Sequence, residues 1–113
     1  MNNKPIIIVS GEPNSVFLEI FFKSLKSNKY RSPLLIICSK KLLQKQMEKL
    51  GFNFKINIIK KKFCKFNKLN NKQINLININ YKFNNCFEKI SSKSNSYIKK
   101  SFDVALEIIH QNK

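Results

Sequence analysis

Two short runs of consecutive apolar residues lie in the first third of the chain. Residues 6–9 follow Pro5, and residues 34–38 follow Pro33. A run that is apolar at every position is typical of a strand covered on both faces, as in the centre of a parallel sheet. The sequence therefore predicts a central strand over residues 5–10 and a second strand over residues 34–38.

The segment between these two strands has the period of an amphipathic helix. Asn14 or Ser15 can cap this helix, which ends around Ser27 and Asn28. Its apolar positions form one wide stripe that we expect to face the core, namely Val16, Phe17, Ile20, Phe21 and Leu25. Strand, helix and strand in this order form a βαβ unit, whose crossover is right-handed in nearly all known cases.

A second helix with a clear start and end follows residue 38. Ser39 occupies its cap position, and Gly51 stands where a helix-ending glycine belongs. Its apolar positions repeat at helical intervals and predict one buried side, formed by Leu42, Leu43, Met47 and Leu50. Residues 52–58 then alternate strictly between apolar and polar, which predicts a strand near the sheet edge with one solvent-facing side.

The next part of the chain is less regular. Residues 60–72 show no steady period and predict a basic loop that Phe63, Phe66 and Leu69 attach to the body. Residues 74–81 predict a strand whose apolar phase shifts midway. The shift indicates either a bulge or a strand that is covered on both faces.

The last segment predicts a helix capped by Ser92, Ser94 or Asn95. Its apolar positions predict a buried stripe of Ile98, Phe102, Ala105, Leu106 and Ile109. A helix in an α/β sheet normally leads into a further strand, so the end at Lys113 looks like an interruption. We therefore expect residues 1–113 to be the N-terminal portion of a single α/β domain, truncated at residue 113, with a mostly parallel sheet.

The formal net charge of +16 has two possible explanations. Such a charge often indicates a nucleic-acid partner. However, Arg31 is the only arginine, and Lys, Asn, Ile and Phe are the residues of A- and T-rich codons, so genome bias gives the same composition. Nucleic-acid readers favour Arg. A small basic nucleic-acid-binding module, using residues 60–72 with Phe63 and Phe66, therefore stays the alternative hypothesis.

The cysteines and the apolar runs indicate the compartment. The chain has an odd number of cysteines, Cys38, Cys64 and Cys86, and no two of them have the spacing C-x-x-C. Both features disfavour a disulfide framework or a zinc site. We expect Cys38, at the end of an apolar run, to be a buried and inert thiol. No run approaches the ~20 apolar residues of a membrane span, and the first residues lack the apolar core of a signal peptide. These features predict a cytoplasmic protein.

The first predicted strand ends in Gly11, Glu12 and Pro13, at the edge where open α/β sheets bind their ligands. The following helix directs free N–H groups to the same place. The corner lacks the glycines of a phosphate-binding loop or a dinucleotide fingerprint. It is either a structural turn or a ligand site, and Glu12 either faces a ribose or cation or bonds to nearby N–H groups.

The order of residues at this corner resembles a known opening motif. Residues 9–20, Val-Ser-Gly-Glu-Pro-Asn-Ser-Val-Phe-Leu-Glu-Ile, resemble the start of the 4-hydroxythreonine-4-phosphate dehydrogenase family. That family reads Thr-x-Gly-Asp/Glu-Pro-x-Gly-Ile-Gly-Pro-Glu-Ile/Leu after a strand. The positions that match are Gly11, Glu12, Pro13, Glu19 and Ile20. Ser15, Phe17 and Leu18 replace two glycines and a proline of the family, and the resemblance covers only the family's first third.

The resemblance implies a three-layer α/β/α fold of the isocitrate/isopropylmalate dehydrogenase type that acts as a homodimer. It implies an NAD-dependent oxidoreductase that oxidises and decarboxylates 4-phosphohydroxy-L-threonine in pyridoxal phosphate biosynthesis, with a divalent metal. Gly11 and Glu12 would then lie at the cofactor. The family's metal-binding histidines and its Gly-His-Thr-Glu motif lie beyond the part covered here. The resemblance therefore implies no catalytic or metal-binding residue in this segment, which we expect to be inactive alone.

Three other residues have structural interpretations. His110 lies near a helix C-terminus, where an imidazolium is favoured by the helix dipole. Glu19 is expected to be a structural partner on the first helix. Tyr97 lies beside Ile98 on the last helix and is expected to belong to the core rather than to a cofactor site.

Overall fold

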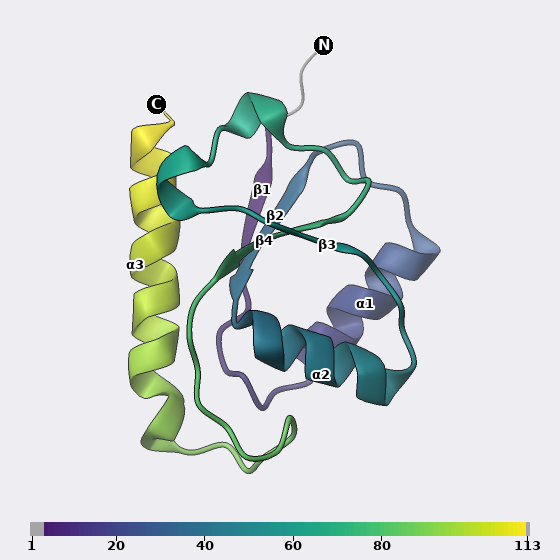
Figure 1. Ribbon diagram of the computed structural model, residues 1–113, viewed down its shortest axis with the longest axis vertical. Coiled ribbons are helices and arrows are strands. Elements are labelled where there is room, and N and C mark those ends of the chain that lie inside the picture. The colour runs from purple at the N-terminus through teal and green to yellow at the C-terminus, as the bar shows by residue number, and fades with distance from the viewer. Residues whose placement is uncertain (1–3, 113) are drawn as a thin grey trace.

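The computed structural model describes residues 4–112, which form a parallel sheet between two layers of helices (Figure 1). In their order across the sheet, the strands are β1 (Ile6–Val9), β2 (Leu34–Cys38), β4 (Ile74–Asn78) and β3 (Ile56–Ile58). The helices are α1 (Phe17–Ser27), α2 (Lys40–Leu50) and α3 (Asn95–Gln111), and the 3-10 helices are η1 (Lys61–Phe63), η2 (Phe66–Lys68) and η3 (Ser92–Ser94). All pairings are parallel, so the predicted α/β class is confirmed.

The two faces of the sheet carry separate hydrophobic cores. On one face α1 and α2 pack over strand residues such as Ile36, with Phe22 and Leu43 fully buried. On the other face α3 packs on residues such as Ile37, with Ile108 fully buried. Burial of one large apolar side chain contributes about 1.5–3 kcal/mol, so both layers of helices stabilise the sheet.

β1 lies at an edge of the described sheet, so the prediction of a central strand is wrong. Among residues 4–112 it pairs only with β2, with Ile8 opposite Ile36, and Ile6 is 48% exposed. The strand is apolar on both faces because Ile8 packs on the α1 side and Ile7 on the α3 side. Coverage by helices, rather than a second neighbouring strand, explains the two-sided pattern.

The side of α1 that faces the core overlaps the predicted apolar stripe only in part. Leu18, Phe21 and Phe22 are buried, whereas Val16 and Ile20 are 66% and 56% exposed. The prediction is confirmed for Phe21, which is buried, and for Phe17 and Leu25, which pack against the core. It is wrong for Val16 and Ile20, because the helix has apolar residues around most of its circumference. Only one side can face both α2 and the sheet.

The helix ends agree with the sequence for α2 and disagree for α1. The Ser39 hydroxyl accepts a backbone N–H of the first turn of α2 at 3.2 Å, and Gly51 ends the helix with a left-handed φ of 80°. Both predictions are confirmed. α1 begins at Phe17 without a side-chain cap, so a cap at Asn14 or Ser15 is wrong, although the Ser15 hydroxyl accepts the Phe17 N–H at 3.3 Å.

The positions of β3 and β4 explain the apolar patterns of residues 52–58 and 74–81. β3 lies at the sheet edge as predicted, but it is shorter than residues 52–58. Phe52 and Phe54 precede it and stack on each other against the α1–α2 core. In β4, Leu76 belongs to one core and Ile77 to the other. Coverage of both faces therefore explains the phase shift.

The basic connection between β3 and β4 is attached to the α3 side of the sheet. Phe66 and Leu69 pack against the core there, together with the buried Cys64. Phe63 does not attach the loop, because its side chain is 63% exposed. The predicted anchoring is therefore confirmed for Phe66 and Leu69 and wrong for Phe63.

α3 has two apolar sides, and the structure buries the one that its predicted stripe did not select. The buried residues are Tyr97, Ser101, Val104, Ala105 and Ile108. Of the predicted stripe, only Ala105 is buried and Ile98 is half-buried. The predicted interruption at Lys113 concerns a residue outside the described range.

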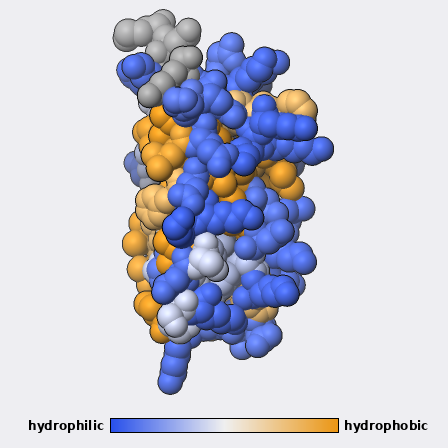
Figure 2. Space-filling model, turned by 90° about the vertical axis from the view of Figure 1, so that its left-hand side faces the viewer, coloured by the Kyte–Doolittle hydropathy of each residue, from blue (hydrophilic) through white to orange (hydrophobic). Residues whose placement is uncertain are grey.

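The rest of that stripe forms an exposed surface, which we call the α3 outer stripe: Phe102, Leu106 and Ile109, which are 52%, 66% and 42% exposed. Glu107 lies on another flank of α3 and forms an ion pair with Lys61 of η1 at 2.7 Å. The outer stripe therefore lies on a different flank of α3 from the one that faces η1. Figure 2, a view of the α3 side, shows apolar surface along one margin of this face. Within residues 4–112, no helix has the length and apolar character to span a membrane.

Candidate functional site

The N-termini of α1, α2 and α3 meet at the carboxyl edge of the sheet (Figure 1). α1 and α2 follow β1 and β2 directly, and α3 reaches both strand ends through Tyr97, which contacts Ser10 and Ser39. Helix N-termini carry a partial positive charge and free N–H groups. The corner of Gly11, Glu12 and Pro13 therefore lies where an anion is stabilised.

Gly11 has a conformation that favours glycine. Its φ is +69°, in the left-handed region, and a Cβ atom built there would have no heavy atom within 4 Å. The position therefore requires glycine for its backbone conformation rather than for lack of space in the fold. The open space beside the Cα also lets a ligand approach the backbone closely.

Glu12 uses both carboxylate oxygens within the protein. Its Oε1 accepts the N–H of Asn14 at 3.1 Å, and its Oε2 accepts the hydroxyl of Ser94 at 3.0 Å. Ser94 precedes α3, so the carboxylate joins the end of β1 to the start of α3 and neutralises part of the positive helix termini. These contacts match a structural turn, and a direct role of Glu12 at a cofactor stays a prediction.

A second loop covers the corner. The amide of Gln46 donates to the carbonyls of Pro13 at 3.1 Å and Cys86 at 2.7 Å, and the Glu88 N–H donates to Asn14 at 3.0 Å. Gln46 is fully buried, and its Oε1 has no hydrogen-bond partner within residues 4–112. Gln46 is not among the predicted site residues, although the sequence contains a signal for it: it is a polar residue on the buried side of α2 between apolar positions.

Tyr97 connects α3 to the ends of two strands. Its hydroxyl accepts the N–H of Ser39 at 2.8 Å and lies 3.4 Å from the Ser10 hydroxyl oxygen. The centroid of its ring is 4.8 Å from the centroid of the Tyr81 ring. Burial, followed by the nearby Cys38 thiol, raises the pKa of Tyr97 to about 12. Tyr97 is a core residue as predicted, and its hydroxyl is a structural link that the periodicity could not show.

The remaining candidate residues lie in ordinary structural settings. Glu19 forms an exposed ion pair with Lys23 at 3.5 Å, and His110 is exposed near the end of α3. Cys38 is fully buried, so its predicted burial is confirmed. Burial raises the pKa of its thiol far above the ordinary range, which disfavours the reactive thiolate. The structure does not bring Glu19 or His110 to the corner.

Two features of the corner bear on ligand binding. The backbone at Gly11 is open to close approach, beside helix N-termini that favour a phosphate. Within residues 4–112 no group of three or more His, Cys, Asp or Glu side chains is placed to hold a metal ion. The helix N-termini favour an anionic group, a role that the Glu12 carboxylate already fills in part.

Comparisons with known proteins do not assign this chain to a family. No protein-family model matches it, and a search of curated proteins gave no match.

Proposed function

We propose that this chain is the N-terminal part of an NAD-dependent, divalent-metal-dependent 4-hydroxythreonine-4-phosphate dehydrogenase of pyridoxal phosphate biosynthesis. The observation that carries the proposal is the Gly-Glu-Pro corner. Its residue order resembles the opening of that family, and Gly11 has the left-handed φ that makes glycine necessary there. The corner also lies at the carboxyl end of a parallel strand, the usual ligand edge of such sheets.

The layers of the fold support the same proposal. α1 and α2 cover one face of the parallel sheet and α3 covers the other, as expected for a domain of the isocitrate/isopropylmalate dehydrogenase type. In this proposal the full-length protein is a cytoplasmic homodimer that binds a small phosphorylated amino acid. The residues that hold the metal and the substrate lie outside this chain.

The corner residues have distinct roles in the proposal. The Gly11 backbone approaches the cofactor, while Glu12 positions the start of α3 through its hydrogen bond with Ser94. When bound, NAD supplies the hydride acceptor and the metal polarises the substrate oxygen. The segment alone is expected to show no turnover.

The first test is the coding DNA beyond the codon for Lys113. A reading frame that continues with Gly-His-Thr-Glu and spaced histidines would support the proposal. A stop codon at that place would contradict it, because the family's active site would be missing.

A second test uses two matched glycines in the full-length protein. Gly11 and Gly51 both have left-handed φ values, +69° and +80°, and both have open space at the Cβ position. An alanine at either place costs about 1 kcal/mol of folding free energy. We expect only Gly11→Ala to raise the KM for NAD as well. An equal KM effect from Gly51→Ala, which lies at the end of α2, would contradict a cofactor contact at Gly11.

The alternative is binding of single-stranded nucleic acid by the basic connection. The exposed Phe63 favours it, with the Lys62 amino group 5.2 Å from its ring centroid. This hypothesis predicts affinity for oligonucleotides that falls steeply as salt rises above about 50 mM, and a loss of affinity in Phe63→Ala. Negligible binding at the lower salt concentration, measured by fluorescence anisotropy, would reject it.

A further inference from the structure

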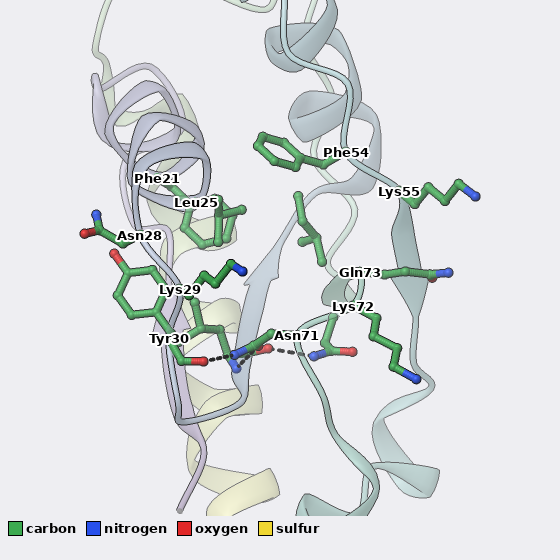
Figure 3. A pocket seen from close by; sticks show the side chains of 13 residues that line it. Phe21, Leu25, Asn28, Lys29, Tyr30, Phe54, Lys55, Asn71, Lys72 and Gln73 are labelled. Carbon is green, nitrogen blue, oxygen red and sulfur yellow. Dashed lines mark hydrogen bonds between the residues drawn. The ribbon is translucent and has the colours of Figure 1, made fainter.

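A cavity of about 390 Å³ lies at the amino edge of the sheet, opposite the Gly-Glu-Pro corner (Figure 3). It opens between the end of α1, the segment before β3, and the starts of β2 and β4. Its volume is near the lower end of the range of ~300–1,000 Å³ for small-molecule sites. The cavity therefore suits a single ring with a short chain and is too small for a dinucleotide.

The walls of the cavity are mainly apolar. Phe21 and Leu25 come from α1, and Figure 3 shows the ring of Phe54 pointing across the space toward them. Leu34 and Ile74, at the starts of β2 and β4, also line it. Phe21, Leu34 and Ile74 are buried, which gives the site an ordered wall for the apolar part of a ligand.

Two amide groups in the cavity lining, those of Asn71 and Asn75, are already used by the fold. Asn71 donates to the carbonyls of Tyr30 and Ser32 at 3.1 and 2.8 Å and accepts the Leu34 N–H at 2.8 Å. Asn75 donates to the Leu34 carbonyl at 2.9 Å. These bonds fix the lining and leave these amides little capacity to bind a ligand.

The charged residues in the lining are all cationic. Lys29, Lys55 and Lys72 line the cavity, and no Asp or Glu of the described chain does so. In Figure 3 the Lys29 side chain extends into the space beside Leu25, whereas Lys55 and Lys72 extend away from it. Within residues 4–112, Lys29 forms no ion pair or side-chain hydrogen bond. One ammonium group, on an exposed lysine, is thus available to a ligand beside the apolar wall of the cavity.

We propose that this cavity binds a small apolar carboxylate, such as an arylalkanoic acid. The ring packs between Phe54 and the α1 residues Phe21 and Leu25, and the carboxylate accepts hydrogen bonds from the Lys29 ammonium. A single inward amine suits a monoanion, whereas phosphate recognition normally uses several donors. The site lies at the opposite edge of the sheet from the Gly-Glu-Pro corner. Its test is therefore independent of the dehydrogenase proposal.

The test is a titration of the 113-residue chain with 3-phenylpropionate, followed by calorimetry and by two-dimensional amide NMR. We expect saturable binding, with the largest amide shifts at residues 25–30 and at Phe54. The neutral analogue 3-phenylpropanol should bind about tenfold more weakly, because it lacks the charge-assisted hydrogen bond. Absence of saturation up to about 10 mM ligand, or shifts confined to the α3 outer stripe, would overturn the proposal.

Two matched variants separate the site from general attraction to a cationic protein. Lys29→Gln and Lys55→Gln remove the same charge from two exposed residues that line the cavity, and neither is expected to affect folding. Lys29→Gln should weaken 3-phenylpropionate binding about tenfold, and Lys55→Gln by less than about threefold. Equal weakening by both variants would overturn the assignment of the carboxylate to Lys29.

Discussion

The helices α2 and α3 differ in the number of apolar sides that they present. In α2 the apolar residues occupy one side, and the structure buries Leu42, Leu43 and Met47 as the period predicts. In α3 two sides are apolar, and the structure buries Ile108 while it leaves Leu106 exposed. The comparison shows that periodicity identifies the apolar sides of a helix. It predicts which side faces the core only when the helix has a single apolar side.

Two features of α3 explain which of its sides is buried. Small residues, Ser101 and Ala105, are on the buried side and let the helix approach the sheet closely. Tyr97 is on the same side, where its hydroxyl accepts the Ser39 N–H. The α3 outer stripe has bulkier residues such as Phe102 and no hydrogen bond like that of Tyr97. Close packing and the pairing of buried polar groups therefore favour the observed orientation.

The largest expected effect compares two aliphatic residues of α3. Ile108→Ala should lower the free energy of unfolding by about 2–5 kcal/mol, because it leaves a cavity in the core. Leu106→Ala, on the outer stripe, should change it by about 0.5 kcal/mol or less. Urea unfolding followed by circular dichroism measures both. Equal losses would mean that the outer stripe is buried in solution, and the distinction between the two sides would fail.

A smaller effect is expected on the buried side of α2. Gln46→Leu should cost about 1–3 kcal/mol, because the carbonyls of Pro13 and Cys86 lose their donor. Gln44→Leu, an exposed change on the same helix, is the control and should be nearly neutral. The same unfolding measurement applies. A stabilising Gln46→Leu would show that the hydrogen bonds to the corner do not contribute to folding.

The next prediction concerns pH and Tyr97. Burial raises its folded pKa to about 12, above the ordinary value of ~10 in an unfolded chain. The unfolded state therefore loses this proton first, and the stability present below pH ~10 is lost as the pH rises toward 12.

Tyr97→Phe should remove part of that pH dependence and lower stability by about 1 kcal/mol at neutral pH, where the Ser39 N–H loses its acceptor. Melting temperatures at several alkaline pH values measure both effects. Tyr81→Phe, whose ring packs against Tyr97, is the control. An unchanged pH profile in Tyr97→Phe would contradict the proposed effect of burial.

The smallest effect on stability is expected for the α3 outer stripe. Leu106→Gln should leave the free energy of unfolding nearly unchanged and should raise the solubility of the chain, because large exposed apolar patches promote association. Ile90→Gln replaces a similarly exposed residue, 69% against 66%, outside that stripe. Sedimentation velocity compares them. If Ile90→Gln reduces association as much as Leu106→Gln does, the stripe is not the associating surface.

The candidate site was predictable only in part. The corner at Gly11 was visible because glycine and proline after an apolar run mark the end of a strand. For Glu12, the bond to the nearby Asn14 N–H was one of the predicted alternatives. The bond to Ser94 was not visible, because Ser94 lies 82 positions away in the chain. The link from Tyr97 to Ser39 also depends on the register of α3 against the sheet, which no local pattern encodes.

By itself, the sequence determined the element types, the parallel α/β class and the α2 helix with its Ser39 cap and Gly51 end. These features depend on local backbone preferences and on the period of apolar residues, which are short-range properties. Only the tertiary structure decided that β1 lies at an edge of the described sheet, which side of α3 is buried, and that Val16 and Ile20 of α1 are exposed. Those choices depend on which apolar surfaces pack most closely and leave the fewest polar groups unpaired, so they require all the elements together.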